Sequence, residues 1–235
     1  MPARAQECRA RVTAMRRLTA EILEADLTMV DPPSFAFEAG QWVSVPFGPK
    51  LVRAYSLASP PRSSALITLC ADVAPGGLGS AWFRELRPDQ EVRFKGPLGG
   101  FVFSRADARR PVFVAEEIGI VPIRSILTDL YETGFGRSTT LVYAARDGRW
   151  LAYDAEFHSL ARRFPEFAYH PLAEGVVSPA SPLANQTAAA VDRIVTDVKN
   201  VLAYVSGGGT TIDRVRDVLM AKGMDRKAVK WEKFW

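Results

Sequence analysis

Three short motifs between residues 53 and 101 point to the fold: Arg53-Ala54-Tyr55-Ser56, then Gly76-Gly77-Leu78-Gly79-Ser80, then Gly96-Pro97-Leu98-Gly99-Gly100-Phe101. They follow one another at intervals of about 20 residues, and all of them precede a half of the chain in which strand and helix patterns alternate. Each motif alone is weak evidence, because glycine-rich turns and exposed arginines are common on protein surfaces. Their order and spacing carry the information.

The residues around these motifs predict an antiparallel β domain. Short runs with β-branched and aromatic residues alternate with Pro and Gly through the first hundred positions, and they include 42–45, 66–70 and 91–95. Short strands at such spacing are typical of a barrel or a sandwich. One short helix is predicted inside this half, over residues 80–86.

After Arg109-Arg110 the pattern changes to continuous apolar runs that alternate with helix-period segments. The runs 111–115, 140–144 and 201–205 predict buried strands, and helices are predicted from Pro122, over 154–163, and after a cap at Thr210. Strand-helix alternation of this kind forms a mostly parallel sheet. We therefore predict two domains, 1–108 and 109–235. Residues 174–199 fit a long loop, a helix, or both.

Composition excludes several classes of protein. The net charge of +4 over 235 residues is small for a dedicated nucleic-acid binder, and no apolar run approaches a membrane span. Two cysteines, Cys8 and Cys70, are too few for a disulfide framework or a four-cysteine iron-sulfur site. Neither histidine has neighbours at ligand spacing, so no metal site is expected. The arginine-rich start lacks the apolar run of a secretory signal, so we expect a cytoplasmic protein.

The three motifs together resemble the flavin-binding half of the ferredoxin-NADP reductase family. The resemblance implies a Greek-key β-barrel for the flavin, followed by a Rossmann-like α/β domain. It implies that Arg53 contacts the flavin pyrophosphate, that Tyr55 packs on the isoalloxazine ring, and that Ser56 hydrogen-bonds near its N5 as a catalytic group. These residue types suit the roles, because Arg offers a bidentate fork to phosphate and an aromatic ring offers a stacking surface. An exposed arginine beside a strand is the plainer alternative.

The glycine loop completes the implied cofactor site. Glycines let the backbone approach a phosphate closely, and the following helix offers its N-terminal N–H groups. Ser80 adds a hydroxyl donor, whereas residues 96–101 are expected to form a structural corner. The C-terminal aromatic would favour FAD over FMN, because only the dinucleotide has an adenine to stack on; it could equally be a packed or frayed end. The resemblance thus implies these cofactor contacts: Arg53, Ala54, Tyr55, Ser56, Leu69, Gly76, Gly77, Leu78, Gly79, Ser80 and Trp235.

The nicotinamide half departs from the family in three places. Where the family has a Gly-Gly-Thr-Gly-Ile type turn, this chain has Glu116 and Glu117 before Ile118-Gly119-Ile120. If a carboxylate there pointed at a pyrophosphate about 4 Å away, repulsion would cost from several-fold to about a thousandfold in affinity.

Two further positions also differ. Ser206 replaces the family's reactive-site cysteine, and we retain it as a catalytic position. No Ser-Arg pair follows residues 167–172, so the choice between NADPH and NADH is open. The nucleotide contacts that the resemblance still implies are Gly119, Ile120, Arg146, Arg149, Gly207 and Gly208. Solvated arginines and a flexible glycine turn are the alternatives.

These observations predict a flavoprotein oxidoreductase in which electrons pass from NADPH or NADH through FAD to a separate protein acceptor, such as ferredoxin, flavodoxin or an oxygenase component. A second hypothesis is a flavin-binding electron-transfer subunit that no longer reacts with nicotinamide nucleotides and takes electrons from a protein donor. A third is a scaffold or sensor that keeps only the fold.

Overall fold

A computed structural model describes residues 4–62, 64–173 and 182–234. The chain forms two compact units, and each is interrupted in sequence. One consists of Met1–Phe103 and Val121–Phe135, the other of Ser104–Ile120 and Gly136–Trp235. The predicted boundary between a flavin domain and a nucleotide domain at residue 108 stays a prediction. Residues 121–135, which follow that boundary in the sequence, belong to the first unit.

The first unit contains a closed antiparallel barrel with strand order β4-β3-β6-β1-β2-β5. The edge strands β4 and β5 meet through a bridge between Leu57 and Leu69, and the Ala58 amide donates to the Thr68 carbonyl at 2.8 Å. The barrel predicted from sequence is therefore confirmed. Its elements are β1 (Gln6–Arg17), β2 (Ile22–Asp31), β3 (Trp42–Pro46), β4 (Val52–Ser56), β5 (Leu66–Asp72), α1 (Leu78–Glu85) and β6 (Glu91–Leu98).

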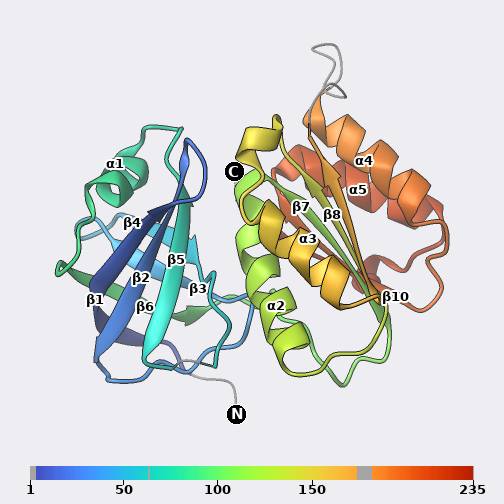
Figure 1. Cartoon of the computed structure of the whole chain (residues 1–235). Helices are drawn as coiled ribbons and strands as arrows, with labels where there is room; N and C mark the ends of the chain where they lie inside the picture. Colours follow the sequence, from blue (N-terminus) through green and yellow to red (C-terminus); the bar gives the residue numbers. More distant parts are fainter. Residues whose placement is uncertain (1–3, 63, 174–181, 235) are drawn as a thin grey trace. The chain divides into compact units, whose positions relative to one another are not determined.

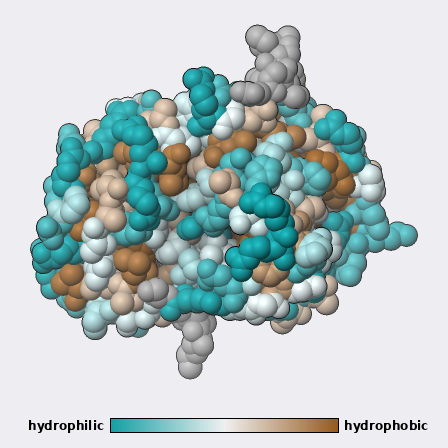
Figure 2. All heavy atoms as spheres, in the orientation of Figure 1, coloured by the Kyte–Doolittle hydropathy of each residue, from teal (hydrophilic) through white to brown (hydrophobic). Residues whose placement is uncertain are grey.

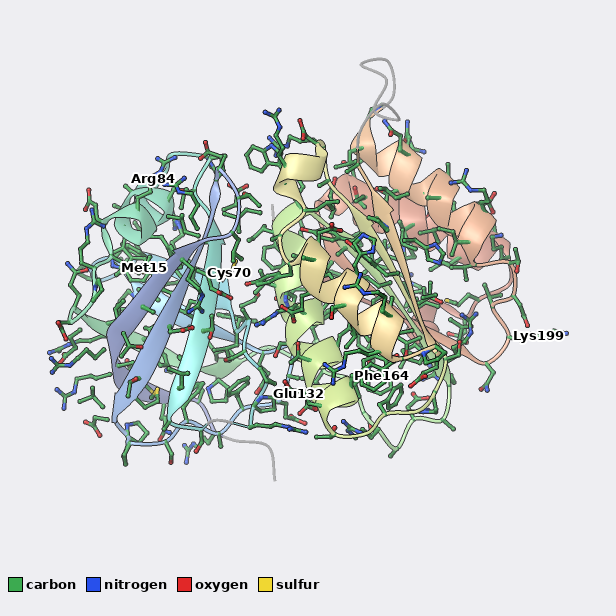
Figure 3. The ribbon with its side chains drawn as sticks, viewed as in Figure 1. Met15, Cys70, Arg84, Glu132, Phe164 and Lys199 are labelled. Carbon is green, nitrogen blue, oxygen red and sulfur yellow. The ribbon has the colours of Figure 1, made fainter. Side chains whose placement is uncertain are left out.

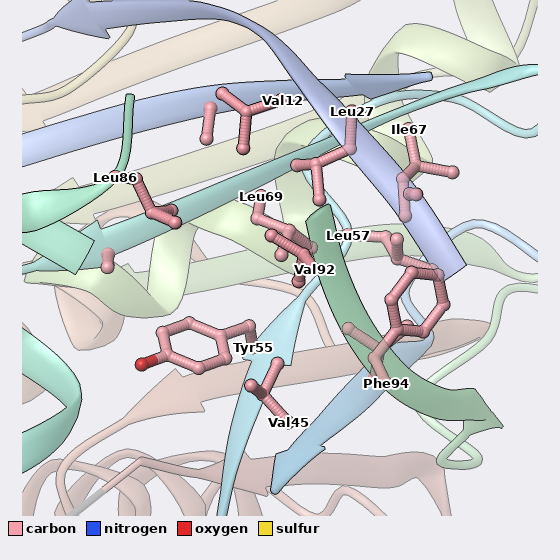
Figure 4. Packing of buried hydrophobic residues seen from close by; sticks show 14 of the residues in the cluster. Val12, Leu27, Val45, Tyr55, Leu57, Ile67, Leu69, Leu86, Val92 and Phe94 are labelled. Atoms are coloured by element: carbon pink, nitrogen blue, oxygen red, sulfur yellow. The ribbon is translucent and has the colours of Figure 1, made fainter. Parts of the chain in front are cut away.

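Alternation along the strands fills the barrel with apolar side chains. In β6, for example, Val92 and Phe94 are buried while their neighbours face outward, as a strand with one buried face requires. Figure 4 shows this core, with Tyr55 at its border and the Tyr55 hydroxyl pointing away from Phe94. Cys70 lies buried in β5 (Figure 3).

The corner at residues 96–101 is structural, as expected. A Cβ at Gly99 would lie 2.6 Å from the Trp42 indole, and one at Gly40 would lie 2.1 Å from the Phe101 carbonyl. Both glycines also have positive φ, which side chains disfavour. The Gln41 amide donates to the Gly99 carbonyl at 3.2 Å and so ties the two turns together.

Helix α2 (Ile120–Glu132) is hydrogen-bonded to the barrel at the segment that follows β4. The fully buried Ser125 hydroxyl donates to the Ser59 carbonyl at 2.7 Å, and the Arg124 guanidinium donates to the Ala58 carbonyl at 2.8 Å. These bonds satisfy two carbonyls near the closure of the barrel. This explains why most of α2 groups with the first unit although its sequence continues from the second.

The second unit is built on a parallel sheet with strand order β11-β10-β7-β8-β9. Figure 1 shows α3 on one face of this sheet and α4 with α5 on the other. The doubly wound domain predicted from sequence is confirmed. Its elements are β7 (Arg110–Glu116), β8 (Thr139–Ala144), α3 (Asp154–Arg163), β9 (Phe167–Leu172), α4 (Leu183–Ile194), β10 (Val201–Gly207), α5 (Gly209–Ala221) and β11 (Val229–Lys233), with short 3-10 turns at Glu117–Gly119, Gly148–Trp150 and Arg226–Ala228.

The structure decides one open alternative between a loop and a helix and corrects one predicted helix cap. The stretch that fitted either a loop or a helix contains α4, whose apolar face includes the buried Ala188 and Val191. Helix α5 starts two residues earlier than a cap at Thr210 would allow, because Gly208 is the cap and Thr210 lies inside the first turn. Residues 212, 215 and 219 are buried, as predicted.

Within the described ranges, none of the helices has the length and apolar character needed to cross a membrane. On the face visible in Figure 2, apolar side chains occur in small groups separated by hydrophilic ones. Within the same ranges, no cluster of three or more His, Cys, Asp or Glu is placed to hold a metal ion.

Candidate functional site

The cation at position 53, the ring at position 55 and the glycine loop converge in the first unit. The Tyr55 hydroxyl donates to the Gly79 carbonyl at 3.1 Å. A Cβ at Gly79 would lie 2.8 Å from that hydroxyl and 3.3 Å from Cγ of Arg53. Glycine at position 79 therefore lets the loop lie against β4 without a shift of the Tyr55 side chain.

The start of α1 offers unsatisfied backbone donors beside this convergence. Gly77 is the cap residue, no side chain caps the helix, and its first turn has no acidic residue. The first backbone hydrogen bond of α1 runs from the Ala81 N–H to the Gly77 carbonyl at 2.9 Å. The N–H groups of residues 78–80 therefore have no partner within the helix. Arg53 is exposed next to them. An exposed guanidinium beside N-terminal amides has the chemistry of a phosphate site, and these residues therefore fit the diphosphate of FAD.

The ring of Tyr55 is buried among other aromatic side chains and exposes little surface on which a ligand could stack. It is 7% exposed, and its centroid lies 5.3 Å from that of Trp82 and 5.7 Å from that of Phe83. Burial raises the pKa of Tyr55 to about 12, so its hydroxyl stays a donor at physiological pH. The stacking role of Tyr55 remains a prediction. Sequence reasoning assigned no role to Trp82, which is partly exposed and belongs to the same aromatic group.

The other predicted flavin contacts lie in different environments. Gly76, Gly77, Leu78 and Ala54 are exposed, whereas Ser56 and Ser80 are nearly buried, with Ser80 Oγ 3.5 Å from the Asp72 carbonyl. Leu69 lies fully buried in the barrel core and has a packing role there. Trp235 falls outside the described residues.

In the second unit, the two carboxylates that replace glycines are both held by the chain itself. Glu117 accepts hydrogen bonds from two nitrogens of the Arg146 guanidinium, which also lies 4.6 Å over the Trp150 ring. Glu117 has φ +48°, in the left-handed region that glycine occupies without cost. The turn therefore keeps a glycine-like backbone, and an ion pair offsets part of the conformational cost.

Glu116 ends β7 and reaches the start of α5. Its Oε2 accepts a hydrogen bond from the Gly208 amide at 2.8 Å, and the side chain is 8% exposed. Burial raises the pKa of Glu116, against the opposing effects of the Gly208 amide and the Thr211 hydroxyl. A Cβ at Gly207 would lie 2.6 Å from Glu116 Cβ, so glycine is required where the two strand ends meet.

The remaining predicted nucleotide residues are placed as follows. A Cβ at Gly119 would lie 2.4 Å from the Ser206 carbonyl, so this glycine lets the turns after β7 and β10 pack together. Ile120 and Ser206 are fully buried, and within the described ranges the Ser206 hydroxyl has no hydrogen-bond partner. The Arg149 side chain is 83% exposed and pairs with Asp147. The catalytic role of Ser206 stays a prediction.

A closed antiparallel barrel, followed along the chain by a doubly wound parallel sheet, is the architecture of two-domain flavin-dependent oxidoreductases. Residues 10–103 match the family model described as an oxidoreductase FAD-binding domain. The chain belongs to the ferredoxin-NADP reductase family: it is 32% identical to ferredoxin-NADP reductase B of Sorangium cellulosum over 168 residues, which cover 70% of this chain and 69% of that protein.

Other matches extend over nearly the whole chain. It is 25% identical to the reductase component of propane 2-monooxygenase from Rhodococcus jostii, over 97% of this chain and 64% of that protein. Several such relatives are therefore longer than the chain. Among solved structures, the cytochrome P450 reductase GcoB of Amycolatopsis superposes with a TM-score of 0.84 at 23% identity, covering 98% of this chain and 70% of that one. The ferredoxin-NADP+ reductase of Plasmodium falciparum also superposes with a TM-score of 0.84, at 16% identity, covering 97% and 96%. These likenesses show the fold.

Proposed function

We propose that this chain holds FAD through Arg53 and the 76–80 loop and carries electrons from NADPH or NADH to a separate protein acceptor. The observation that carries the proposal is the convergence of Arg53, Tyr55 and Gly79 next to the uncapped start of α1. FAD, when bound, supplies hydride acceptance and one-electron transfer.

The chain's own residues supply binding and position. Arg53 offers a planar fork of donors to a diphosphate, and the amides before Ala81 offer further donors. The Tyr55 hydroxyl bond to Gly79 fixes the loop against β4, so the phosphate donors are positioned before the cofactor arrives. Such preorganisation reduces the entropy lost on binding.

The acceptor class follows from the relatives, whose names include reductase components of oxygenase systems. No four-cysteine cluster site is possible with two cysteines, so an iron-sulfur centre would have to be on another molecule or on a further part of the protein. We propose a ferredoxin, a flavodoxin or an oxygenase component as the acceptor. A soluble protein of the cytoplasm fits this role.

A second function is favoured by one observation, the Glu116 carboxylate on the Gly208 amide. If that contact prevents nucleotide binding, the chain is an electron-transfer subunit that receives electrons from a protein donor.

Anaerobic mixing of the FAD-loaded protein with NADH, and separately with NADPH, tests the two. Loss of the oxidised-flavin absorbance within seconds with either nucleotide supports the first function. Failure with both, while dithionite reduces the flavin, favours the second. A purified protein that is colourless and takes up no added FAD would contradict both.

A further inference from the structure

The Glu116 carboxylate lies where a doubly wound sheet ordinarily receives anionic ligands. Strands β7 and β10 are neighbours in the sheet, and the chain leaves them towards opposite sides of the strand order, which is the topological switch point. Glu116 is the last residue of β7, and Gly208 follows the last residue of β10. The hydrogen bond between them joins residues 92 positions apart.

This carboxylate occupies the positive end of α5. Gly208 is the cap residue of this 13-residue helix, which has no side-chain cap of its own and no acidic residue in its first turn. The Glu116 carboxylate at the end of β7 therefore supplies the negative charge that the N-terminus of α5 attracts.

A cavity of about 640 Å³ opens beside the contact. Its lining contains a buried polar group: the Thr211 hydroxyl is 1% exposed and faces the Glu116 carboxylate, but none of the described residues lies within hydrogen-bond distance to satisfy it. A buried hydroxyl without a partner is costly and suits a ligand that supplies an acceptor. The lining combines the starts of α4 and α5 with two acidic side chains and one lysine: Glu116, Pro182, Leu183, Ala184, Gly208, Gly209, Thr210, Thr211, Asp213 and Lys233.

We propose that Glu116 is an internal anion that competes with nucleotide phosphate for the start of α5 and thereby sets the affinity of this chain for NADPH and NADH. The inference rests on the proposed function, in which the second unit receives the nucleotide. The Gly208 amide cannot donate a full hydrogen bond to the Glu116 carboxylate and to a phosphate at the same time. In addition, two anions in a poorly solvated site repel each other. A nucleotide must therefore displace the carboxylate or bind while it is protonated.

Competition of this kind makes binding depend on pH. The groups that face Glu116 are Glu117 and Arg146 at the same strand ends, the Gly208 amide and Thr211 hydroxyl of α5, and Asp213 and Lys233 in the cavity. Protonation of Glu116 removes the repulsion, so the affinity for the nucleotide rises as the pH falls. Binding is then accompanied by proton uptake.

The test measures affinity rather than turnover. NADP+ and NAD+ are titrated by calorimetry into the FAD-loaded full chain at pH 6 and pH 8. Glu116→Gln keeps the size and the hydrogen bond while it removes the charge, and Glu116→Ala also vacates the Gly208 amide. Asp217→Asn makes the same charge change at an exposed position farther along α5.

At pH 8, Glu116→Gln should bind at least one nucleotide tenfold or more tightly than the unaltered chain, and Glu116→Ala should do so as well. The gain should shrink at pH 6, and Asp217→Asn should change the affinity by less than twofold. Equal affinities for Glu116→Gln and Asp217→Asn would overturn the inference, and so would weaker binding or no binding by both Glu116 variants. Melting temperatures within a few degrees establish that the variants fold.

The inference and the proposed function fail in different ways. Rapid flavin reduction of the unaltered chain together with unchanged affinity in Glu116→Gln would refute the inference and leave the function intact. Tighter binding by Glu116→Gln without flavin reduction in either protein would support the inference and refute NADPH or NADH as the electron donor.

Discussion

Tyr55 and Gly79 lie 24 positions apart and are joined by a hydrogen bond of 3.1 Å from the phenol to the carbonyl. The bond connects strand β4 to the first turn of α1, and Cγ of Arg53 packs against the same glycine. The motifs Arg53–Ser56 and Gly76–Ser80, which are separate in the sequence, are therefore in direct contact in the structure. The position of each motif depends on the other.

Replacing Gly79 by alanine should destabilise the barrel unit, because its methyl group would lie 2.8 Å from the Tyr55 hydroxyl and 3.3 Å from Arg53 Cγ. Overpacking of this kind costs about 1–3 kcal/mol. Gly77→Ala is the matched control, since a Cβ at Gly77 meets nothing within 4 Å and its φ is −75°. Urea unfolding of both variants measures the difference. A Gly79→Ala protein as stable as Gly77→Ala would show that the loop does not need the close approach.

Removing the Arg53 guanidinium should weaken FAD binding without unfolding the protein. Arg53 is exposed, and its guanidinium donates to the neighbouring Val52 carbonyl at 3.0 Å, so Arg53→Ala should leave the core intact. Loss of a charge-assisted contact of about 1.5–3 kcal/mol lowers the affinity by about 10- to 100-fold. Titration of apoprotein with FAD, followed by flavin fluorescence, measures it. Arg93→Ala, an exposed arginine of β6, should bind FAD like the unaltered chain; similar losses in both variants would count against a specific contact.

The pair formed by Glu117 and Arg146 should contribute more to stability than the pair formed by Asp147 and Arg149. The Glu117 side chain is 7% exposed, so Arg146→Ala leaves a poorly solvated carboxylate unpaired and should cost about 1–3 kcal/mol. Arg149 is 83% exposed, and Arg149→Ala should cost less than about 1 kcal/mol. Thermal or urea unfolding of both variants checks the order. Combining Arg146→Ala with Glu117→Gln should restore part of the loss, and an additive double variant would argue against coupling.

The contribution of the Asp26 carboxylate to the stability of the barrel should be lost at acidic pH. Burial alone would raise its pKa, but hydrogen bonds from Arg16 and Thr68 prevail and lower it. A carboxyl group whose pKa is lower in the folded state stabilises the fold above its unfolded pKa, and this stabilisation is lost as the pH falls through the folded value. Asp26→Asn should therefore cost about 1 kcal/mol at pH 7, and the gap to the unaltered chain should narrow below about pH 4. A gap that is independent of pH between 7 and 3 would rule out this charge effect.

The strands and most helices follow from local patterns in the sequence. The continuous apolar runs at 111–115, 140–144 and 201–205 lie within β7, β8 and β10, because strands covered on both faces need apolar side chains at every position. Helix α3 has the predicted bounds, with acidic residues in its first turn and arginines in its last.

Long-range contacts could not be predicted in the same way. The sequence drew attention to Glu116 and Glu117 as departures, but not to their partners, since the Gly208 amide lies 92 positions away and Arg146 lies 29 positions away. The attachment of α2 likewise depends on a buried serine whose acceptor is 66 positions upstream. A single polar residue on an otherwise apolar helix face does not reveal which carbonyl it meets.

The interleaving of the two units has a consequence for how the protein is made. A ribosome that has released the first 103 residues has completed all six barrel strands, yet the Ser59 carbonyl still lacks the Ser125 hydroxyl that caps it in the finished structure. Synthesis must run through the first strand of the other unit and on to about residue 135 before the first unit is complete. A gene fragment that stops at residue 108 would therefore encode the barrel strands without the part of α2 that completes the first unit, and separate expression of this unit should extend through Phe135.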